Sequence, residues 1–493
     1  MTIATLLWSA ADAHPERTAV RTADRTVSYA QLRARASAVA AALVAAGVEP
    51  GERVAILLPN GVDAAAAIYG VAAAGAVFTV VNWLSRPRQV EQILAVTGAR
   101  VLLTTRAWDG LQPRRLESVT PCWYIEELSV GPPWDPVPRT AEELAQICFT
   151  SGSTGAPKGV MVTQGNLLAG IGTVQRYLGV EATDRIASLL PLSFVYGLNQ
   201  LNLSIASGAT LDVIDPTLAV DTVEAVIGRE CTVLAAVPPL WGQLLAVPGF
   251  ARAAASLRVL TCAGGRLPPD TVRALRSALP GARLFLMYGL TEVFRSTYLP
   301  PDEVEAHPDS MGYAVPGSRV EVLRDDGTVC AAGEIGELVH AGPTVALGYW
   351  QDPDGTARVF REREDADGIR ARWVFSGDLV RRDEEGRLYY VGRRDRMFKT
   401  LGYRVSPDEV TDAIHDSGLV TDAALTTEPD PARGARIVAH VVLRPEATLD
   451  ALRRWCGAEL PRHLLPARWT VHEQLPRNAS GKHDLVHLER GDP

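Results

Sequence analysis

A segment rich in glycine and hydroxyl side chains, FTSGSTGAPKGVMVT at residues 149–163, carries the clearest sign of chemistry in this chain. A strand-like run at 146–149 leads into it, and Lys158 is its one cation. Small residues let backbone N–H groups approach phosphate oxygens, hydroxyl groups add donors, and the lysine adds charge. The Gly-Lys-Ser/Thr spacing of a Walker A loop is absent. The segment therefore indicates another type of phosphate loop, with a plain surface turn as the alternative.

The elements that must position this loop alternate between helix and strand over the first 130 residues. We expect a helix at 28–46 with Ser28 as its N-cap and a strand at 54–58. Such alternation favours a parallel sheet covered by helices. Further apolar runs continue the pattern at 185–190, 210–214, 233–237 and 257–262.

The uncharged stretch 64–84 is long enough to span a bilayer, but weakly apolar alanine dominates it and Gly70 and Gly75 interrupt it. We expect a buried helix followed by a strand at 77–81. From about Ser318 the pattern changes to shorter strands with polar turns, typical of a small barrel or meander. A charged run at 392–396 then marks a boundary before a last small domain.

Composition is that of an ordinary multidomain globular protein of 493 residues, with 47% hydrophobic and 22% charged residues. The net charge of −8 is spread along the chain, which argues against a nucleic-acid surface or an anionic-membrane anchor. Six scattered cysteines without a CxxC pair, and an N-terminus without a basic leader, favour a reducing cytoplasm.

Six further segments follow the phosphate loop in a fixed order, and the whole set resembles the superfamily of acyl- and aryl-CoA synthetases, luciferases and nonribosomal peptide adenylation domains. Each segment is only moderately specific alone, whereas the ordered set is strongly so. The segments are LLPLSFVYGLNQ (189–200), LTCAGGRLPP (260–269), LMYGLTEVFRSTYLPP (286–301), FSGDLVRRDEEGRLYYVGRRDR (375–396), KTLGYRVSPDEV (399–410) and LPRNASGKHDL (475–485).

The resemblance implies an α/β fold with a large N-terminal domain, built from stacked α/β subdomains and a small barrel, and a small mobile α+β C-terminal domain. The large domain would cover residues 1–392, a hinge 393–396 with Asp395 at its centre, and the small domain 397–493. A hinge of this kind requires a residue with room to change its backbone angles. Gly402 would then line the channel for an incoming thiol, since glycine lets pantetheine pass close to the backbone.

ATP and magnesium are the cofactors that the resemblance implies. Thr291 would contact phosphate and Glu292 would hold Mg²⁺, a hard cation that prefers carboxylate and phosphate oxygens. Asp378 would accept hydrogen bonds from the ribose hydroxyls, with Arg393 beside it. The phosphates would be bound by Thr150, Ser151, Gly152, Ser153, Thr154, Gly155 and Lys158, and the adenine by Gly264, Gly265 and Tyr288.

Lys482 matches the lysine that bridges the substrate carboxylate and the phosphate ester oxygen in the family. Attack of a carboxylate on the α-phosphate brings two anions together, so catalysis needs cations and hydrogen-bond donors more than a nucleophilic side chain. Taken singly, Glu292, Asp378 and Lys482 are each consistent with an ordinary surface charge or turn residue. Their place in the ordered motifs favours the functional assignment.

The acid substrate would meet nine residues of the large domain. Amino-acid-activating relatives carry an aspartate at the position of Val195, so its absence argues against an α-amino acid. Val195-Tyr196 is similar to the Asn-Tyr pair of aryl-acid-activating relatives, in which the tyrosine packs on the ring and the asparagine meets an ortho hydroxyl. Arg295 would pair either with a polar substituent or with an acid such as Glu292. The nine residues are Val195, Tyr196, Asn199, Ala236, Thr261, Ala263, Met287, Arg295 and Ser296.

The expected function is that of an AMP-forming ligase: an aryl or small acyl acid is activated to acyl-AMP and passed to the thiol of CoA or of a separate phosphopantetheinyl carrier protein. No Gly-Gly-x-Ser carrier motif is present in the sequence. The segment FRSTYLPP also resembles acyl ligases of exosortase or capsule clusters, so a fatty or aliphatic acid remains an alternative substrate. The alternatives are an amide- or ester-forming ligase and an inactive nucleotide-binding homologue. A monomer or a homodimer is expected.

Overall fold

The structure of the protein is a computed structural model, and its described part forms two compact units that we call unit 1 and unit 2. Unit 1 comprises Met1–His307, Gly312–Val320 and His340–Phe375, and unit 2 comprises Pro308–Met311, Glu321–Val339 and Ser376–Pro493. The structure describes residues 1–85, 87–111, 120–128, 133–151, 157–365, 367–396, 398–400, 403–430, 434–460, 464–478 and 481–490.

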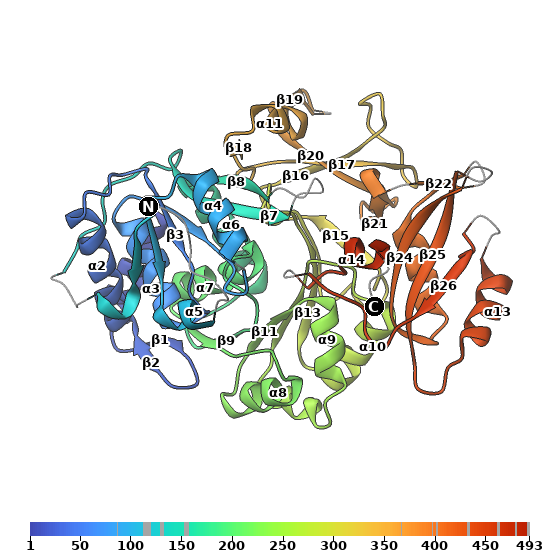
Figure 1. Ribbon diagram of the computed structural model, residues 1–493, viewed down its shortest axis with the longest axis horizontal. Coiled ribbons are helices and arrows are strands. Elements are labelled where there is room, and N and C mark those ends of the chain that lie inside the picture. The colour runs from blue at the N-terminus through green and yellow to red at the C-terminus, as the bar shows by residue number, and fades with distance from the viewer. Residues whose placement is uncertain are drawn as a thin grey trace. The chain divides into compact units, whose positions relative to one another are not determined.

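The apolar runs near the N-terminus form the inner strands of a first sheet in unit 1. Its inner strands β3, β4 and β5 are parallel and buried along nearly their whole length, as expected for strands covered on both faces. Helices α2 and α3 lie beside one another in the blue part of Figure 1. In spatial order the strands are β18 (Gly348–Tyr349), β8 (Pro157–Thr163), β7 (Leu144–Ser151), β4 (Val77–Val80), β3 (Arg53–Ile56), β5 (Val101–Thr104) and β6 (Cys122–Tyr124).

Two helices of this region, α2 and α3, were expected from the sequence. Ser28 caps α2 through a reciprocal pair of hydrogen bonds with Gln31, which satisfies free backbone donors of the first turn. The uncharged stretch forms a buried helix and then strand β4, as predicted. The helices are α1 (Ile3–Ala13), α2 (Tyr29–Ala45), α3 (Val62–Ala73), α4 (Pro87–Thr97), α5 (Arg106–Leu111) and α6 (Gln164–Leu178).

A second sheet in unit 1 carries the parallel strands β10, β9, β11, β12 and β13, which are neighbours in that order. The four apolar runs predicted from 185 to 262 all form strands of this sheet. Parallel strands point their carboxyl ends to one edge, so the loops after them converge there. The strands are β1 (Thr18–Arg21), β2 (Thr26–Ser28), β9 (Arg185–Ser188), β10 (Thr210–Val213), β11 (Val233–Ala236), β12 (Val259–Cys262), β13 (Arg283–Tyr288), β14 (Thr297–Leu299) and β15 (Ser310–Ala314).

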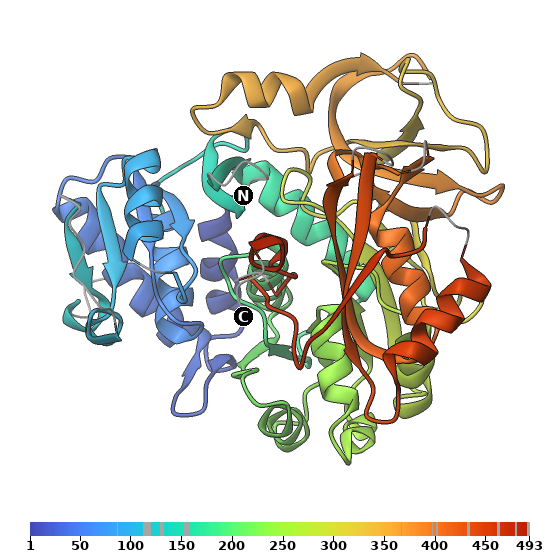
Figure 2. The same ribbon diagram turned by 45° about the vertical axis from the view of Figure 1, so that its right-hand side comes forward.

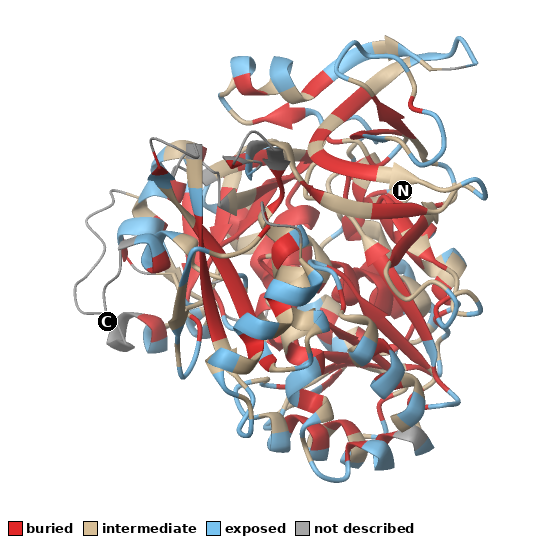
Figure 3. Ribbon diagram, turned by 90° about the vertical axis from the view of Figure 1, so that its right-hand side faces the viewer, coloured by how far each residue is buried: buried red, intermediate tan, exposed pale blue. Residues whose placement is uncertain are grey.

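Helices cover this second sheet and leave polar faces to solvent. Side chains of these strands belong to the two hydrophobic cores. Exposed positions, pale blue in Figure 3, lie on the outer faces of the helices. The helices are α7 (Val195–Ser207), α8 (Ala219–Gly228), α9 (Pro238–Leu245) and α10 (Pro269–Ala278), followed later by α11 (Pro353–Val359) and the strand β19 (Phe360–Glu364).

Unit 2 contains the shorter strands and the C-terminal region. Strands β20 and β21 form an antiparallel hairpin, and β24 and β25 form a long one that comes forward in Figure 2. Helices α12 and α13 contribute to the core of the second hairpin. Strands β16, β17 and β20 lie only partly in unit 2, because His340 and the first residues of β16 and β20 belong to unit 1. The elements that lie wholly or partly in unit 2 are β16 (Arg319–Leu323), β17 (Ile335–Ala341), β20 (Arg370–Arg382), β21 (Leu388–Arg393), β22 (Phe398–Thr400), β23 (Tyr403–Val405), α12 (Pro407–Asp416), β24 (Val420–Asp430), β25 (Gly434–Leu443), α13 (Leu449–Glu459), β26 (Arg468–Val471) and α14 (Leu485–Arg490).

The predicted mixed α/β class, with a large N-terminal and a small C-terminal part, is confirmed by these elements and by the solved structures reported below. Among the described residues no helix is both long and apolar enough to cross a membrane. The boundary at 392 and the hinge at 393–396 remain predictions.

Candidate active site

The phosphate segment forms the hairpin of strands β7 and β8. Thr150 pairs with Lys158 across this hairpin, so both lie at its turn end. The strand-like run predicted before the loop is the inner part of β7. Gly152, Ser153, Thr154 and Gly155 lie outside the described residues, as does the side chain of Ser151.

Lys158 and Glu292 are brought together by an aromatic residue that the sequence reasoning missed. Lys158 Nζ lies 5.2 Å from the ring centroid of Tyr349, and the Tyr349 hydroxyl donates a 2.6 Å hydrogen bond to Glu292 Oε1. Strand β18 places Tyr349 there because it pairs antiparallel with β8, opposite Val160. The backbone N–H of Ala346 also donates to the carbonyl of Glu292 at 2.9 Å. The Lys158 ammonium and the Glu292 carboxylate are therefore both contacted by the side chain of Tyr349.

This cluster suits a magnesium-bound phosphate chain. Among the described residues Glu292 forms no ion pair, and its other carboxylate oxygen, Oε2, is left to a ligand. Lys158 likewise has no carboxylate partner in the described part of the chain. A hard cation takes carboxylate and phosphate oxygens together, and a lysine neutralises the remaining phosphate charge. The residues present fit the group that the sequence implied.

The predicted adenine residues lie at the carboxyl edge of the second sheet. Strand β12 ends at Cys262 and leads into Gly264, whose φ of 88° lies in the left-handed region that glycine adopts readily. Tyr288 ends β13, the neighbouring parallel strand, and its ring lies 6.0 Å from that of His340. Nucleotides bind at this edge in many open α/β sheets. Gly265 and Thr291 follow in the same two loops.

The nine predicted acid-binding residues all lie in unit 1, at the ends of neighbouring elements. Val195, Tyr196 and Asn199 lie in the first turns of α7, which follows β9. The others lie at or after the carboxyl ends of strands β11, β12 and β13, or at the entry to β14: Ala236, Thr261, Ala263, Met287, Arg295 and Ser296.

Tyr196 is the centre of direct contacts within this set. Its hydroxyl shares a 2.6 Å hydrogen bond with the Thr261 hydroxyl, and the Arg295 guanidinium lies 4.9 Å from its ring centroid. Burial raises the pKa of the Tyr196 phenol, which therefore stays neutral. The sequence left Arg295 with two alternatives, and the pair with Glu292 is wrong, because no ion pair joins these residues. An aromatic face, a hydroxyl and a cation thus meet in one place.

Ser296 contacts a second residue that the sequence did not single out, His340 at the end of β17. The Ser296 hydroxyl and His340 Nδ1 share a hydrogen bond, and His340 Nε2 is buried without a partner among the described residues. Burial lowers the pKa of His340 to about 3, so the ring is neutral. Met287 Sδ accepts a hydrogen bond from Tyr177, and Asn199 Oδ1 is buried without a described partner.

Asp378 and Arg393 form a pair in unit 2. They face one another across the β20–β21 hairpin, with Arg393 Nη1 3.2 Å from Asp378 Oδ1 and 3.2 Å from the carbonyl of Ser376. The backbone N–H of Asp378 donates to the Ser376 hydroxyl at 3.0 Å. The Asp378 side chain is buried, and its carboxylate is held in one orientation. Such an anchored carboxylate suits recognition of two ribose hydroxyls.

Lys482 lies within electrostatic range of this pair in unit 2. Burial of its ammonium group lowers the pKa of Lys482, and the positive charges of Arg396 and Arg393 lower it further. The carboxylates of Asp378 and Asp408 act in the opposite direction and raise this pKa. The residue nevertheless keeps an exposed surface, so a ligand can reach it. Its backbone N–H is tied to Asn478 Oδ1 at 3.1 Å. Gly402 lies outside the described residues, and so does the side chain of Asp395.

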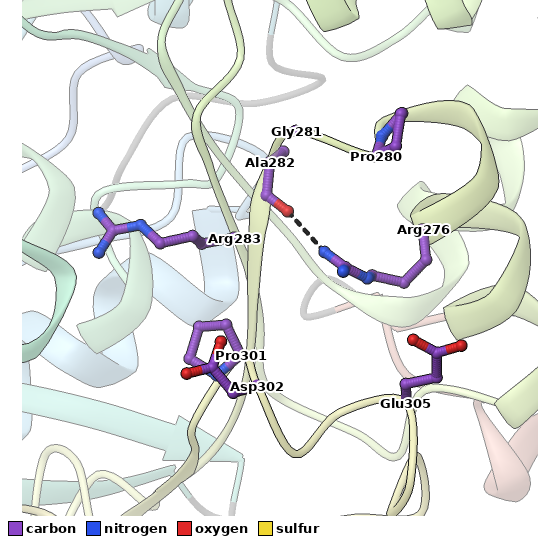
Figure 4. Close-up of a pocket in the computed structure, with 8 residues that line it drawn as sticks. All are labelled: Arg276, Pro280, Gly281, Ala282, Arg283, Pro301, Asp302 and Glu305. Atoms are coloured by element: carbon purple, nitrogen blue, oxygen red, sulfur yellow. Dashed lines mark hydrogen bonds between the residues drawn. The ribbon is translucent and has the colours of Figure 1, made fainter.

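A surface pocket elsewhere in unit 1 involves none of the predicted site residues. Arg276 Nη1 donates a 2.9 Å hydrogen bond to the carbonyl of Ala282 beside it (Figure 4). The lining residues are Arg276, Pro280, Gly281, Ala282, Arg283, Pro301, Asp302 and Glu305.

Two family models match the chain: "AMP-binding enzyme" over residues 7–350 and "AMP-binding enzyme C-terminal domain" over residues 409–482. The chain belongs to the AMP-binding enzyme family. It is 31% identical to the sulfoacetate–CoA ligase of Cupriavidus necator, over 89% of this chain and 87% of the relative. It is 30% identical to the indoleacetate–CoA ligase of Aromatoleum aromaticum, over 95% and 94% respectively.

Solved structures of the family agree with this membership. The o-succinylbenzoate CoA synthetase of Bacillus subtilis, in complex with its acyl-adenylate intermediate, matches with a TM-score of 0.84 and 26% identity over 98% of this chain and 97% of that one. The same enzyme has been solved with ATP and a magnesium ion, with a TM-score of 0.86 and 27% identity over 98% and 99%. The predictions of an AMP-forming ligase and of ATP and Mg²⁺ as its cofactors are confirmed at the level of the family.

Proposed function

We propose that this AMP-binding enzyme activates an aryl or small acyl carboxylic acid with ATP and passes the acyl group to a thiol. The observation that carries the proposal is the Lys158–Tyr349–Glu292 cluster in the same unit as Tyr196 and its partners. One set of residues suits a polyphosphate and the other suits an acid with an apolar or aromatic body. The likeness to CoA ligases of aryl and aliphatic acids supports the same assignment.

In the first step a carboxylate oxygen of the acid attacks the α-phosphorus of ATP, the bond to the β-phosphate oxygen breaks, and pyrophosphate leaves. The hairpin of β7 and β8 holds the phosphates, and Lys158 neutralises their charge. Glu292, oriented by Tyr349, would hold Mg²⁺, which shields charge on the phosphate oxygens when bound. Lys482 would supply a further cation to the reacting oxygens.

In the second step a thiol attacks the acyl carbonyl, the bond to AMP breaks, and the thiol proton is released to solvent. We propose that residues 397–493 rotate about Asp395 between the steps, withdrawing Lys482 and presenting Gly402 to the acceptor. CoA is the proposed acceptor, and a separate acyl carrier protein is the second candidate. None of the six cysteines forms a disulfide in the described structure, which is consistent with the proposed reducing cytoplasm.

ATP–pyrophosphate exchange over a panel of benzoic, hydroxybenzoic, aminobenzoic, aliphatic and amino acids tests the first step. We expect exchange with aryl or short acyl acids and none with α-amino acids, since Val195 replaces the ammonium-binding aspartate. Tight ATP binding with no exchange for any acid would show an inactive nucleotide-binding homologue instead. Thioester formation with CoA, against amide formation with an amine acceptor, tests the second step.

A further inference from the structure

Arg295 is a buried cation that has no counterion among the residues that the structure describes. The residue is 3% exposed, its Nε has no hydrogen-bond partner, and no carboxylate of the described residues lies within ion-pair distance of its guanidinium. Arginine does not lose its proton in proteins, so it cannot escape the cost of burial by becoming neutral. Buried charges are normally paired, and a buried charge left alone is strongly unfavourable. The missing partner must therefore come from elsewhere.

The two tyrosines known to lie near Arg295 are neutral. The face of Tyr196 lies on one side, and the hydroxyl of that ring is engaged by Thr261. Tyr177 lies close enough for the guanidinium charge to oppose the burial that raises the pKa of this phenol to about 12. Glu292, three residues away in sequence, is held by Tyr349 instead. Aromatic faces attract a guanidinium, but they do not neutralise it.

The backbone before Arg295 is strained in a way that fixes its position. Phe294 has a φ of 62°, and the N–H of Arg295 donates to the carbonyl of Val293 at 2.7 Å, which makes a γ-turn of the rare positive-φ form. Two glycines make room for Phe294. A Cβ on Gly170 would come within 2.5 Å of its ring, and a Cβ on Gly289 within 2.7 Å of its carbonyl oxygen. Strain held by such packing is concentrated at functional sites.

We propose that the acid substrate carries a second carboxylate, which binds Arg295. This inference rests on the proposed function. The reacting carboxylate is a poor permanent partner, because it loses its charge when it becomes the acyl phosphate. The phosphates of ATP have Lys158 and the β7–β8 hairpin. A second carboxylate stays anionic through both steps and pairs with the planar guanidinium through two hydrogen bonds.

Matched pairs of acids test the inference in the full-length enzyme: terephthalate against 4-methylbenzoate, and adipate against hexanoate. We expect kcat/KM for ATP–pyrophosphate exchange to favour the diacid at least 10-fold in one pair or both. Arg295→Gln should lower the diacid value about 100-fold and change the monoacid value less than 3-fold. Arg176→Gln, which removes an exposed arginine of α6, is the matched control and should leave both values unchanged.

The remaining outcomes separate this inference from the proposed function. Preference for the monoacid in both pairs overturns the second carboxylate while leaving acid activation intact. Equal loss for both acids in Arg295→Gln would assign Arg295 to the reacting carboxylate and also overturn it. No exchange with any acid refutes the proposed function itself. If Arg295→Gln does not fold, Arg295→Met replaces it. The preference of the wild-type enzyme for diacid over monoacid also tests the second carboxylate and needs no variant.

Discussion

The Tyr349 hydroxyl donates a 2.6 Å hydrogen bond to Oε1 of Glu292, and this contact sets the orientation of the carboxylate. The same ring lies 5.2 Å from Lys158 Nζ. One side chain thus positions both the carboxylate that would hold Mg²⁺ and a cation that would bind phosphate. Tyr349 is a positioning residue in this arrangement, and its contribution can be separated into its hydroxyl and its ring.

Tyr349→Phe removes the hydroxyl and keeps the ring under Lys158. A hydrogen bond to a charged group contributes about 1.5–3 kcal/mol, so we expect kcat for pyrophosphate exchange to fall roughly 10- to 100-fold. The Mg²⁺ concentration for half-maximal rate should rise, whereas a purely structural role would lower thermal stability and leave that concentration unchanged. Tyr349→Leu should also raise KM for ATP, because the ring is then lost as well.

Lys482→Ala should abolish adenylation and largely spare thioester formation from supplied acyl-AMP, because in the proposed mechanism the lysine serves only the first step. Its exposed position in unit 2 predicts little change in the melting temperature. Pyrophosphate exchange and acyl-AMP consumption, measured on the same preparation, check this. Equal loss of both steps would contradict the assignment.

Asp378→Asn should raise KM for ATP about 10-fold or more and leave KM for the acid nearly unchanged. The amide oxygen accepts fewer and weaker hydrogen bonds than the carboxylate, and the charge that holds Arg393 is lost. Asp325→Asn is a suitable control, since it removes an exposed partner of Arg394 in the same unit. A parallel rise in both KM values would argue against a ribose contact.

Gly170→Ala and Gly172→Ala compare two positions two residues apart in α6. A Cβ at Gly170 would meet the Phe294 ring at 2.5 Å, whereas a Cβ at Gly172 meets nothing within 4 Å. We expect Gly170→Ala to lower the free energy of unfolding by about 1–3 kcal/mol and Gly172→Ala to raise it by about 0.5–1 kcal/mol. Urea denaturation measures both, and equal effects would show that Phe294 is not confined there.

His340 makes the free energy of unfolding depend on pH. Burial lowers its folded pKa to about 3, against about 6.5 in the unfolded chain. Between these values the unfolded state binds the extra proton, so stability falls as pH decreases, by up to about 1.4 kcal/mol per unit for this one group. His340→Gln should flatten this part of the pH profile in chemical denaturation at pH 4 to 7. An unchanged slope would mean that the ring is protonated in the folded protein.

Local residue patterns predicted much of the fold because they act over short distances. Ser28 caps its helix through Gln31, three residues away, and the apolar run at 233–237 contains the buried strand β11 (Val233–Ala236). The ordered motifs also predicted an adenine site, and its predicted glycines follow β12 while Tyr288 ends the neighbouring strand β13. Asp378 and Arg393 lie on one hairpin, so their pairing follows from its short turn.

The sequence by itself determined the family, the phosphate segment and the positions of the candidate site residues. Only the tertiary structure showed that Tyr349 supports Glu292 from 57 residues away, and that His340 meets Ser296 from 44 residues away. It also showed that Arg295 and Glu292 form no ion pair, although they are three residues apart in sequence. Whether a charge is paired depends on every acid that folding brings near it, and that is a property of contacts between distant segments rather than of any local pattern.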